Sequence, residues 1–384
     1  MEQRISHGRV HKKKKDKVSF NDLTWRKKKE TLKEQREQKL VKQFEASKVA
    51  REERTQHKEE EEAFADEKPA GTTPFSLSIA IPGSFLNLAQ CDELRAYMAV
   101  QVARAATIYR LEEIIVYDET GRMKQEEVDA YWSGKWQGDL KPSERNIEGN
   151  FHLAKILEYL ECPQYIRKPL FPFHKALRSV GLLHPLDSAH HLKATDFTVP
   201  YREGVVLDKP CKKGRGVYVD VGLDKELFLE NSTPFPPATR ITVELTETGE
   251  DRRLYKGRLA NAKQARDATS LYWGYSVRIA KTLGEVMDRK KYDVVLGMTP
   301  NGGSMNDVEI NLMTRKRILV IFGGVQGVEA ALEGDETVSV PAEQFFDQLV
   351  NPLPFGSGSR SERVEETVLI TLSNLSLRLS QMIL

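Results

Sequence analysis

Three glycine-bearing loops between residues 290 and 366 are the strongest sign of a ligand site in this chain. They span residues 297–303, 322–327 and 353–360. The first two directly follow apolar, strand-like runs, and the third leads into an apolar helical pattern. Glycine permits backbone conformations and close approaches that other residues resist. Three such loops in succession therefore predict one small ligand held largely by backbone groups.

Phosphate binding is the common use of glycine-rich loops, and two sequence patterns test for it. A dinucleotide fold needs Gly-x-Gly-x-x-Gly at its first strand-to-helix turn, with an acidic residue about 20 positions later. Gly323, Gly324 and Gly327 only approach that pattern, and they lie late in the chain. A P-loop is excluded because no Gly-Lys-Ser/Thr follows any glycine. The alternative is that these glycines only form tight turns and bind no ligand.

Residues of the kind that bind metals are few and scattered. His190 and His191 are adjacent, so on a regular element they cannot both face one site. Cys91, Cys162 and Cys211 are odd in number and far apart, which favours neither a disulfide framework nor a zinc site. We therefore interpret the two histidines as part of an ordinary turn, and we expect no metal and a reducing compartment.

The elements that must position the loops indicate a parallel α/β sheet. Buried strand-like runs flank a helical pattern near the start, and the same alternation returns after about residue 266. The segment 340–350 is predicted as a helix, or as a helix preceded by a short strand, and 119–149 as an exposed excursion. The expected strands are 75–81, 113–117, 292–296 and 318–322, and the main expected helices are 93–109, 151–159, 281–287 and 365–379.

Four short β-rich runs separated by turn residues predict a small antiparallel barrel inserted into the α/β domain. The runs are 204–207, 216–221, 240–245 and 255–259. Basic and aromatic residues near its turns fit a nucleic-acid platform, although any soluble barrel carries such residues. These residues are Tyr201, Lys209, Lys212, Lys213, Arg215 and Tyr218.

The composition divides the chain into four segments. A charged tail occupies 1–70, the first part of the α/β domain 71–190, the barrel 191–265, and the second part of the α/β domain 266–384. Residues 1–54 hold 18 Lys or Arg and 9 Asp or Glu, so their net charge is +9. Because the whole chain has a net charge of +2, the remaining residues carry −7.

The tail has too few apolar residues to bury one face of a helix, so we expect it to be disordered, or helical only when bound to a partner. Its basic blocks favour nuclear import and attraction to RNA phosphates. The alternative is a solvated tail without a specific role. No run of about 18 apolar residues predicts a membrane span, and the basic start lacks the apolar core of a signal peptide.

Two segments carry a resemblance to a known family, Leu319–Glu329 and Ser359-Arg360-x-x-Arg363-x-Glu365-Glu366. Weaker matches are 80–84, 160–165, 181–188, 202–204 and 271–275. Together these motifs resemble the SPOUT superfamily of S-adenosylmethionine-dependent methyltransferases, and in particular its archaeal and eukaryotic branch with an inserted OB-fold-like barrel. The resemblance covers roughly residues 75–380.

This resemblance implies a deep trefoil knot at the C-terminal end, S-adenosyl-L-methionine as cofactor, and a homodimer. It further implies methylation of ring nitrogen 3 of a uridine in large-subunit ribosomal RNA or the pre-ribosome, and hence a nuclear, in particular nucleolar, protein without membrane association. The cofactor would lie in a cleft formed by the three loops. The implied cofactor-binding residues are Thr299, Asn301, Gly302, Phe322, Gly323, Gly324, Gly327, Leu353, Gly356, Gly358 and Ser359.

The implied substrate requires a group that accepts the proton of the uracil imide. Glu365 and Glu366 are the candidates, although both could simply be acids favoured by a helix N-terminus. Arg360 and Arg363 would neutralise RNA phosphate or charge that develops on a uracil oxygen. Relatives often carry Ser-Glu-Arg where this chain has Thr299-Pro300-Asn301, so a role for that arginine cannot be transferred.

Two other functions fit the same sequence. The chain could be a non-catalytic RNA-binding factor of ribosome assembly that retains the fold. It could also be a methyltransferase that acts on protein.

Overall fold

The computed structural model describes residues 74–136, 145–210, 216–230, 235–249, 253–353, 358–359 and 363–383. All of them belong to one compact unit, Gly71–Leu384. The N-terminal tail that we predict at 1–70 lies outside the described residues. None of the described helices is long and apolar enough to span a membrane.

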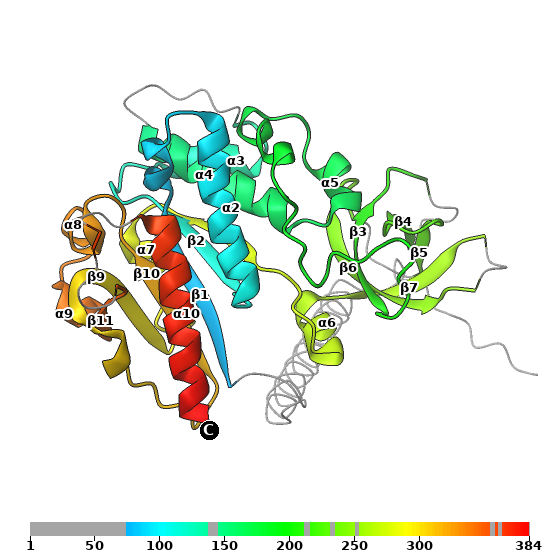
Figure 1. Cartoon of the computed structure of the whole chain (residues 1–384). Coiled ribbons are helices and arrows are strands. Elements are labelled where there is room, and N and C mark those ends of the chain that lie inside the picture. Colours follow the sequence, from blue (N-terminus) through cyan, green and yellow to red (C-terminus); the bar gives the residue numbers. More distant parts are fainter. Residues whose placement is uncertain are drawn as a thin grey trace, which may run out of the picture. The chain divides into compact units, whose positions relative to one another are not determined.

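Six parallel strands form the central sheet, in the order β11-β9-β10-β1-β2-β8 (Figure 1). β1 lies at the centre, where it pairs with β10 on one side and β2 on the other. The predicted parallel sheet is therefore confirmed. The strands are β1 (Phe75–Pro82), β2 (Glu113–Tyr117), β8 (Ser276–Ala280), β9 (Val294–Ser304), β10 (Lys316–Phe322) and β11 (Gln348–Asn351).

Helices cover the sheet on both faces, which explains why its strands are continuous apolar runs. Alternate residues of each strand enter different cores: Ile79 and Ile81 join the core beneath α2, α4 and α10, whereas Ala80 joins the core beneath α7, α8 and α9. The helices are α2 (Asp92–Ile108), α3 (Gln125–Trp132), α4 (Arg145–Glu161), α5 (Gln164–Leu170), α6 (Ala262–Thr269), α7 (Leu283–Val286), α8 (Gly327–Glu333), α9 (Ala342–Phe345) and α10 (Val364–Ile383).

A closed five-stranded barrel lies between β2 and β8 in the chain, with the order β3-β4-β5-β7-β6. The sequence predicted four of its strands and missed β5, whose four residues are too few to show alternation. The barrel is not wholly antiparallel, because β5 and β7 pair in parallel. The strands are β3 (Tyr201–Val206), β4 (Gly216–Asp220), β5 (Leu227–Glu230), β6 (Arg240–Glu247) and β7 (Tyr255–Ala260).

Three sequence expectations need correction. β9 continues through the predicted loop 297–303, and its pairing with β11 jumps from Gly297 to Gly303. In 340–350 the helix α9 comes before the strand β11, not after one. The segment that follows β2 is no exposed excursion over its described part, because Tyr131 and Trp136 are buried against the ring of Phe151.

A buried ionic network joins the barrel to the α/β domain. Arg240 on β6 donates to Glu161 at the end of α4, at 2.5 Å and 3.0 Å, and to Glu203 on β3 at 2.7 Å. Glu203 also accepts from the indole nitrogen of Trp273 at 2.7 Å. Burial alone would raise the pKa of Glu161, but Arg240 and His190 overcome it and hold that pKa at about 2.

The two adjacent histidines belong to this junction. They lie in an irregular turn, and both rings contact the backbone carbonyl of Glu161, His190 Nε2 at 3.1 Å and His191 Nε2 at 2.7 Å. Among the described residues, no cluster of His, Cys, Asp and Glu could hold a metal ion. The irregular backbone is what allows neighbouring side chains to converge on one atom.

We predict that removing either partner of the ionic network destabilises the protein. Arg240→Ala should lower the free energy of unfolding by about 3 kcal/mol, because it removes the guanidinium that pairs with two buried carboxylates. A larger loss is not expected, because the Arg240 side chain is 30% exposed. Denaturant titration at pH 7 measures the loss.

Glu161 should also make stability depend on pH. Its pKa falls from 4.5 to about 2 on folding, so its contribution is complete above pH 4.5 and is lost as the pH falls towards 2. Glu161→Gln should therefore flatten the loss of stability between pH 4.5 and pH 2. An equally steep loss in the variant would show that Glu161 is not the group responsible.

Candidate functional site

The candidate site lies at the carboxyl edge of the sheet, where open α/β folds bind ligands. Because all six strands are parallel, the segments that follow them meet at this one edge. α10 begins at the same edge and runs back along the sheet, so that the C-terminal end lies near the start of β1 (Figure 1). This topology brings the predicted loops and the start of α10 together.

The first predicted loop lies against β11. A Cβ on Gly302 would come within 2.5 Å of the backbone nitrogen of Val350, so only glycine permits this approach. The buried Thr299 hydroxyl donates to Glu329 on α8. Asn301 is exposed. The segment is fixed to β11 by Asn351, whose side chain donates to the carbonyl of Pro300 at 3.0 Å.

Asn351 also fixes the start of the third predicted loop. Its side-chain oxygen accepts from the backbone nitrogen of Leu353 at 2.9 Å, and Leu353 is half-buried. Gly358 faces open space and Ser359 is exposed. Gly356 and Arg360 lie outside the described residues.

The second predicted loop is a tight turn that opens a helix. Phe322 ends β10 as a buried residue, and its carbonyl accepts from the Tyr117 hydroxyl at 2.7 Å. Gly323 packs against the backbone of Gly327 and Val328, where a Cβ would lie 2.3 Å from a nitrogen. Gly327 has a φ of +89° and starts α8. The turn therefore needs its glycines for folding as well as for any ligand.

The structure separates the two carboxylates proposed as proton acceptors. Both lie in the first turn of α10, but Glu365 is buried and Glu366 is exposed. Glu365 Oε2 has no hydrogen-bond partner among the described residues. Arg363 is exposed and lies 3.9 Å from Glu366. Its burial, with no partner for Oε2 in the described part of the chain, distinguishes Glu365 from an ordinary helix-capping acid.

Sequence reasoning missed three polar residues at the same edge. Ser84 Oγ and Asn150 Nδ2 are buried without hydrogen-bond partners among the described residues. Glu119, directly after β2, lies so close to Gly324 that a Cβ there would meet its carboxylate at 1.9 Å. Burial raises the pKa of Glu119, Ser84 lowers it, and Asp118 raises it further.

Their position was a usable signal, because Ser84 follows the predicted strand 75–81 by three residues and Glu119 follows the predicted strand 113–117 by two. Unpaired buried polar atoms are uncommon in folded proteins. Asn150 Nδ2, beside Gly83 at this edge, favours a ligand that supplies the missing partner.

The parallel sheet, the inserted barrel and the glycine turns together define an α/β protein with a candidate small-ligand site at one sheet edge. Comparison with known proteins narrows this class. A family model described as "Putative RNA methyltransferase" matches residues 76–375. The chain therefore belongs to this family of SPOUT RNA methyltransferases.

The relatives agree on this assignment. A Caenorhabditis elegans protein named "Putative methyltransferase spot-1" is 47% identical over 93% of this chain and 91% of its own length. Two proteins named "28S rRNA (uridine-N(3))-methyltransferase" are similar over most of the chain. The one from Drosophila melanogaster is 40% identical over 93% of this chain and 73% of its own length, and the one from Homo sapiens is 39% identical over 85% and 84%.

We predict different effects of alanine at two of the loop glycines. Gly302→Ala should lower the free energy of unfolding by about 1–3 kcal/mol, because its Cβ would collide with the β11 backbone. Gly358→Ala is the matched control, since nothing described lies within 4 Å of its added Cβ. Thermal unfolding compares the two. Equal stability of both variants would show that β9 and β11 are not held this closely together.

Proposed function

We propose that this chain transfers a methyl group from S-adenosyl-L-methionine to ring nitrogen 3 of a uridine in large-subunit ribosomal RNA. The observation that carries the proposal is the likeness to proteins named for this reaction, at 39–40% identity over most of the chain. The glycine turns and unpaired polar atoms at the carboxyl edge support it, because they offer the small, backbone-lined site that a bent nucleoside requires.

The residues at the edge fit this methyl donor chemically. Leu353 and the exposed Val325 offer apolar contact for an adenine ring. Glu329 and Glu119 bring carboxylates that suit a positively charged sulfonium or amine and the hydroxyls of a ribose. Bound there, the cofactor would supply an electrophilic methyl group. The protein's task is then mainly to align the acceptor.

The uridine must lose the proton on nitrogen 3 as it accepts the methyl group. We assign that proton to Glu365, whose unpaired oxygen is already desolvated in the fold. Arg360 and Arg363 would neutralise RNA phosphate or the charge on the uracil oxygens.

We also propose that the C-terminal segment forms the trefoil knot of this superfamily. The strand order supports it, because β11 returns to pair with β9 outside β10 instead of extending the sheet in chain order. Knotting would fix the three loops relative to one another.

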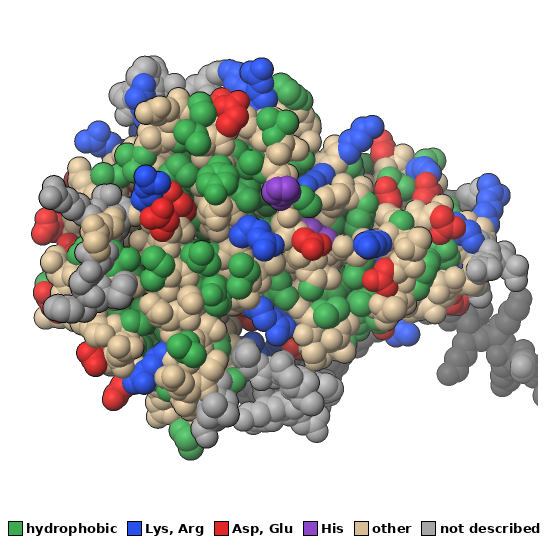
Figure 2. All heavy atoms as spheres, in the orientation of Figure 1, with side chains coloured by type: hydrophobic (Ala, Val, Ile, Leu, Met, Phe, Trp, Pro, Cys, Tyr) green, Lys and Arg blue, Asp and Glu red, His purple; other side chains and the backbone are tan. Residues whose placement is uncertain are grey.

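A homodimer is part of the proposal. α2 and α10 pack side by side, and Figure 2 shows hydrophobic side chains over this face. The exposed large hydrophobic residues of α2 and α10 are Leu94, Tyr97, Ile108, Leu369 and Leu377. Sedimentation of the full chain should give twice the chain mass, and Leu377→Lys should shift it towards monomer.

The remaining partners follow from the substrate. We propose that the protein acts in the nucleus, in the nucleolus where pre-ribosomes assemble, and that the basic residues 1–54 add sequence-blind attraction to RNA.

We predict that the methyl mark depends on Glu365 far more than on Glu366. In cells lacking the gene, one N3-methyluridine should disappear from large-subunit RNA; the mark is detectable because it blocks the pairing edge and stops reverse transcription. When the Glu365→Gln variant is expressed in these cells, the methylation rate should be about 100-fold or more below that with the wild type, which is the usual effect of losing a general base. Glu366→Gln, exposed in the same helix turn, is the matched control and should restore the mark.

Each alternative has a distinct outcome in this experiment. An unchanged map in cells lacking the gene would contradict the RNA substrate and favour a protein acceptor. A map restored by both variants would remove Glu365 from the reaction. Restoration of ribosome assembly without any methyl mark would favour the non-catalytic assembly factor.

A further inference from the structure

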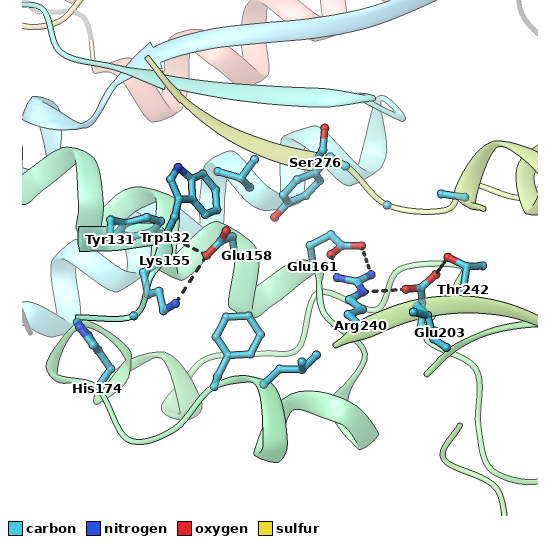
Figure 3. Close-up of a pocket in the computed structure, with 18 of the residues that line it drawn as sticks. Tyr131, Trp132, Lys155, Glu158, Glu161, His174, Glu203, Arg240, Thr242 and Ser276 are labelled. Atoms are coloured by element: carbon cyan, nitrogen blue, oxygen red, sulfur yellow. Dashed lines mark hydrogen bonds and ion pairs between the residues drawn. The ribbon is translucent and has the colours of Figure 1, made fainter. Parts of the chain in front are cut away.

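A cavity lies where the barrel meets the α/β domain, away from the carboxyl edge. Its volume is about 790 Å³. Its walls come from the end of α3, the second half of α4, the segment 170–174, β6 and the segment 273–277. Figure 3 shows side chains from these elements directed towards a common space, with the Glu161–Arg240–Glu203 network at one end. Nothing in the proposed methyl transfer uses it.

The wall is unusually aromatic. Three of the four tryptophans in the chain, Trp132, Trp136 and Trp273, line it. Trp136 and Tyr131 are buried, and Trp136 stacks on His174 with ring centroids 4.8 Å apart. These buried rings form the base of the cavity and also contribute to the packing of the fold.

Two further aromatic side chains on the wall are exposed. Trp132 is 51% exposed at the end of α3, and Phe173 is 89% exposed. Burying such rings against solvent would be favourable, yet the fold leaves them uncovered. They therefore offer free aromatic faces to a flat ligand.

Polar groups between the rings can read the edge of such a ligand. Glu158 accepts from the Tyr131 hydroxyl at 2.9 Å, and Lys155 lies 3.8 Å from the same carboxylate (Figure 3). Burial raises the pKa of Glu158, Lys155 and Tyr131 lower it, and the net shift is upward. A carboxyl group and an ammonium group on one wall can meet both the donors and the acceptors of a nucleobase.

The charges on the wall argue against phosphate as the ligand. Arg240 is already paired with two carboxylates. Glu112, Glu158, Glu161 and Glu203 outnumber Lys155, Arg240 and Arg266 on the lining. A methylated lysine is disfavoured as well, because Lys155 Nζ already lies over the rings of Tyr131 and Phe171, at 5.4 Å and 5.2 Å.

Two elements connect the cavity to the carboxyl edge. α3 follows Glu119 through a turn in which Asp118 accepts from the backbone nitrogens of Arg122 and Met123. α4 starts beside β1, where Asn150 accepts from Gly83, and reaches the cavity at Lys155. Five residues of helix span roughly 8 Å. A nucleotide near the one bound at the edge could therefore reach the cavity.

We propose that this cavity binds an unpaired base of the substrate RNA, next to the target nucleotide, by stacking on Trp132 and Phe173 with Glu158 and Lys155 at the base edge. This deepens the proposed function and rests on RNA as its substrate. Single-stranded RNA is recognised through such stacking, because a base outside a duplex exposes its faces. The barrel then serves to complete one wall of an RNA site.

Anisotropy of a fluorescein-labelled 12-nucleotide single-stranded RNA, titrated with the full chain, tests the proposal. Trp132→Ala and Phe173→Ala should each weaken binding about ten- to hundredfold, the size of one lost base–aromatic stack. Trp132→Phe should recover most of the loss. The slope of log Kd against log salt concentration should not change, because no phosphate contact is removed.

Phe197→Ala is the matched control. Phe197 is 46% exposed, packs on Tyr255 of the barrel, and is absent from the cavity wall. It should bind the single-stranded RNA like the wild type. The same RNA annealed into a duplex should show no difference between the wild type and Trp132→Ala.

Three results would overturn the cavity proposal: wild-type affinity in Trp132→Ala and Phe173→Ala, an equal loss in Phe197→Ala, or no binding of single-stranded RNA by the wild type. Failure of the proposed function looks different. If the ribosomal RNA is methylated but Trp132→Ala and Phe173→Ala bind RNA like the wild type, only the cavity proposal is refuted. An unchanged methylation map with weakened binding by the variants would refute the methyl transfer and leave the RNA site in place.

Discussion

The close approach of β11 to β9 is the constraint on which the candidate site depends. Gly302 lies so near the backbone of Val350 that no side chain fits between the two strands. Asn351 then ties both loops together by bonding to Pro300 on one side and Leu353 on the other. Because β10 ends beside β9, its glycine turn is held at the same edge. The start of the third loop at Leu353 is thus fixed against the first loop, and the turn 322–327 lies at the same edge.

Much of the fold could be predicted because its signals are local. Strands buried on both faces appear as continuous apolar runs, and β2 was predicted with its observed bounds, Glu113–Tyr117. The failures have physical causes as well. β9 runs on through its glycines because β11 supplies a partner that the local sequence does not reveal. The parallel pairing of β5 with β7 depends on barrel closure, which is likewise a non-local property.

The candidate site was only partly predictable. Glycine loops can be recognised by their composition, and Ser84 and Glu119 by their position just after predicted strands. Asn150 lies within a helix, and only the fold brings it to this edge. The two adjacent acids of α10 are a second example. Nothing in the sequence distinguishes Glu365 from Glu366 as a proton acceptor, whereas in the structure Glu365 is buried and Glu366 is exposed.

Several motifs that carry the family resemblance hold the barrel in place. Glu161, Glu203 and Trp273 belong to one hydrogen-bonded junction with Arg240. Arg202, fully buried, donates to the carbonyls of Lys193 and Asp196. The basic turn residues predicted to touch RNA fit less well: Lys209 pairs with Glu226, Tyr218 packs on Phe228, and Lys212, Lys213 and Arg215 lie outside the described residues. We therefore place the proposed RNA contact at the junction and not at the barrel's turns.

The central claim is that the carboxyl edge of the sheet binds S-adenosyl-L-methionine. Isothermal titration of the purified full chain with this cofactor tests it most directly. The account predicts saturable binding at one site per chain, and a marked loss of affinity when Gly324→Leu fills the space beside Glu119. Absence of binding by the folded wild-type chain, or unchanged affinity in the variant, would contradict it.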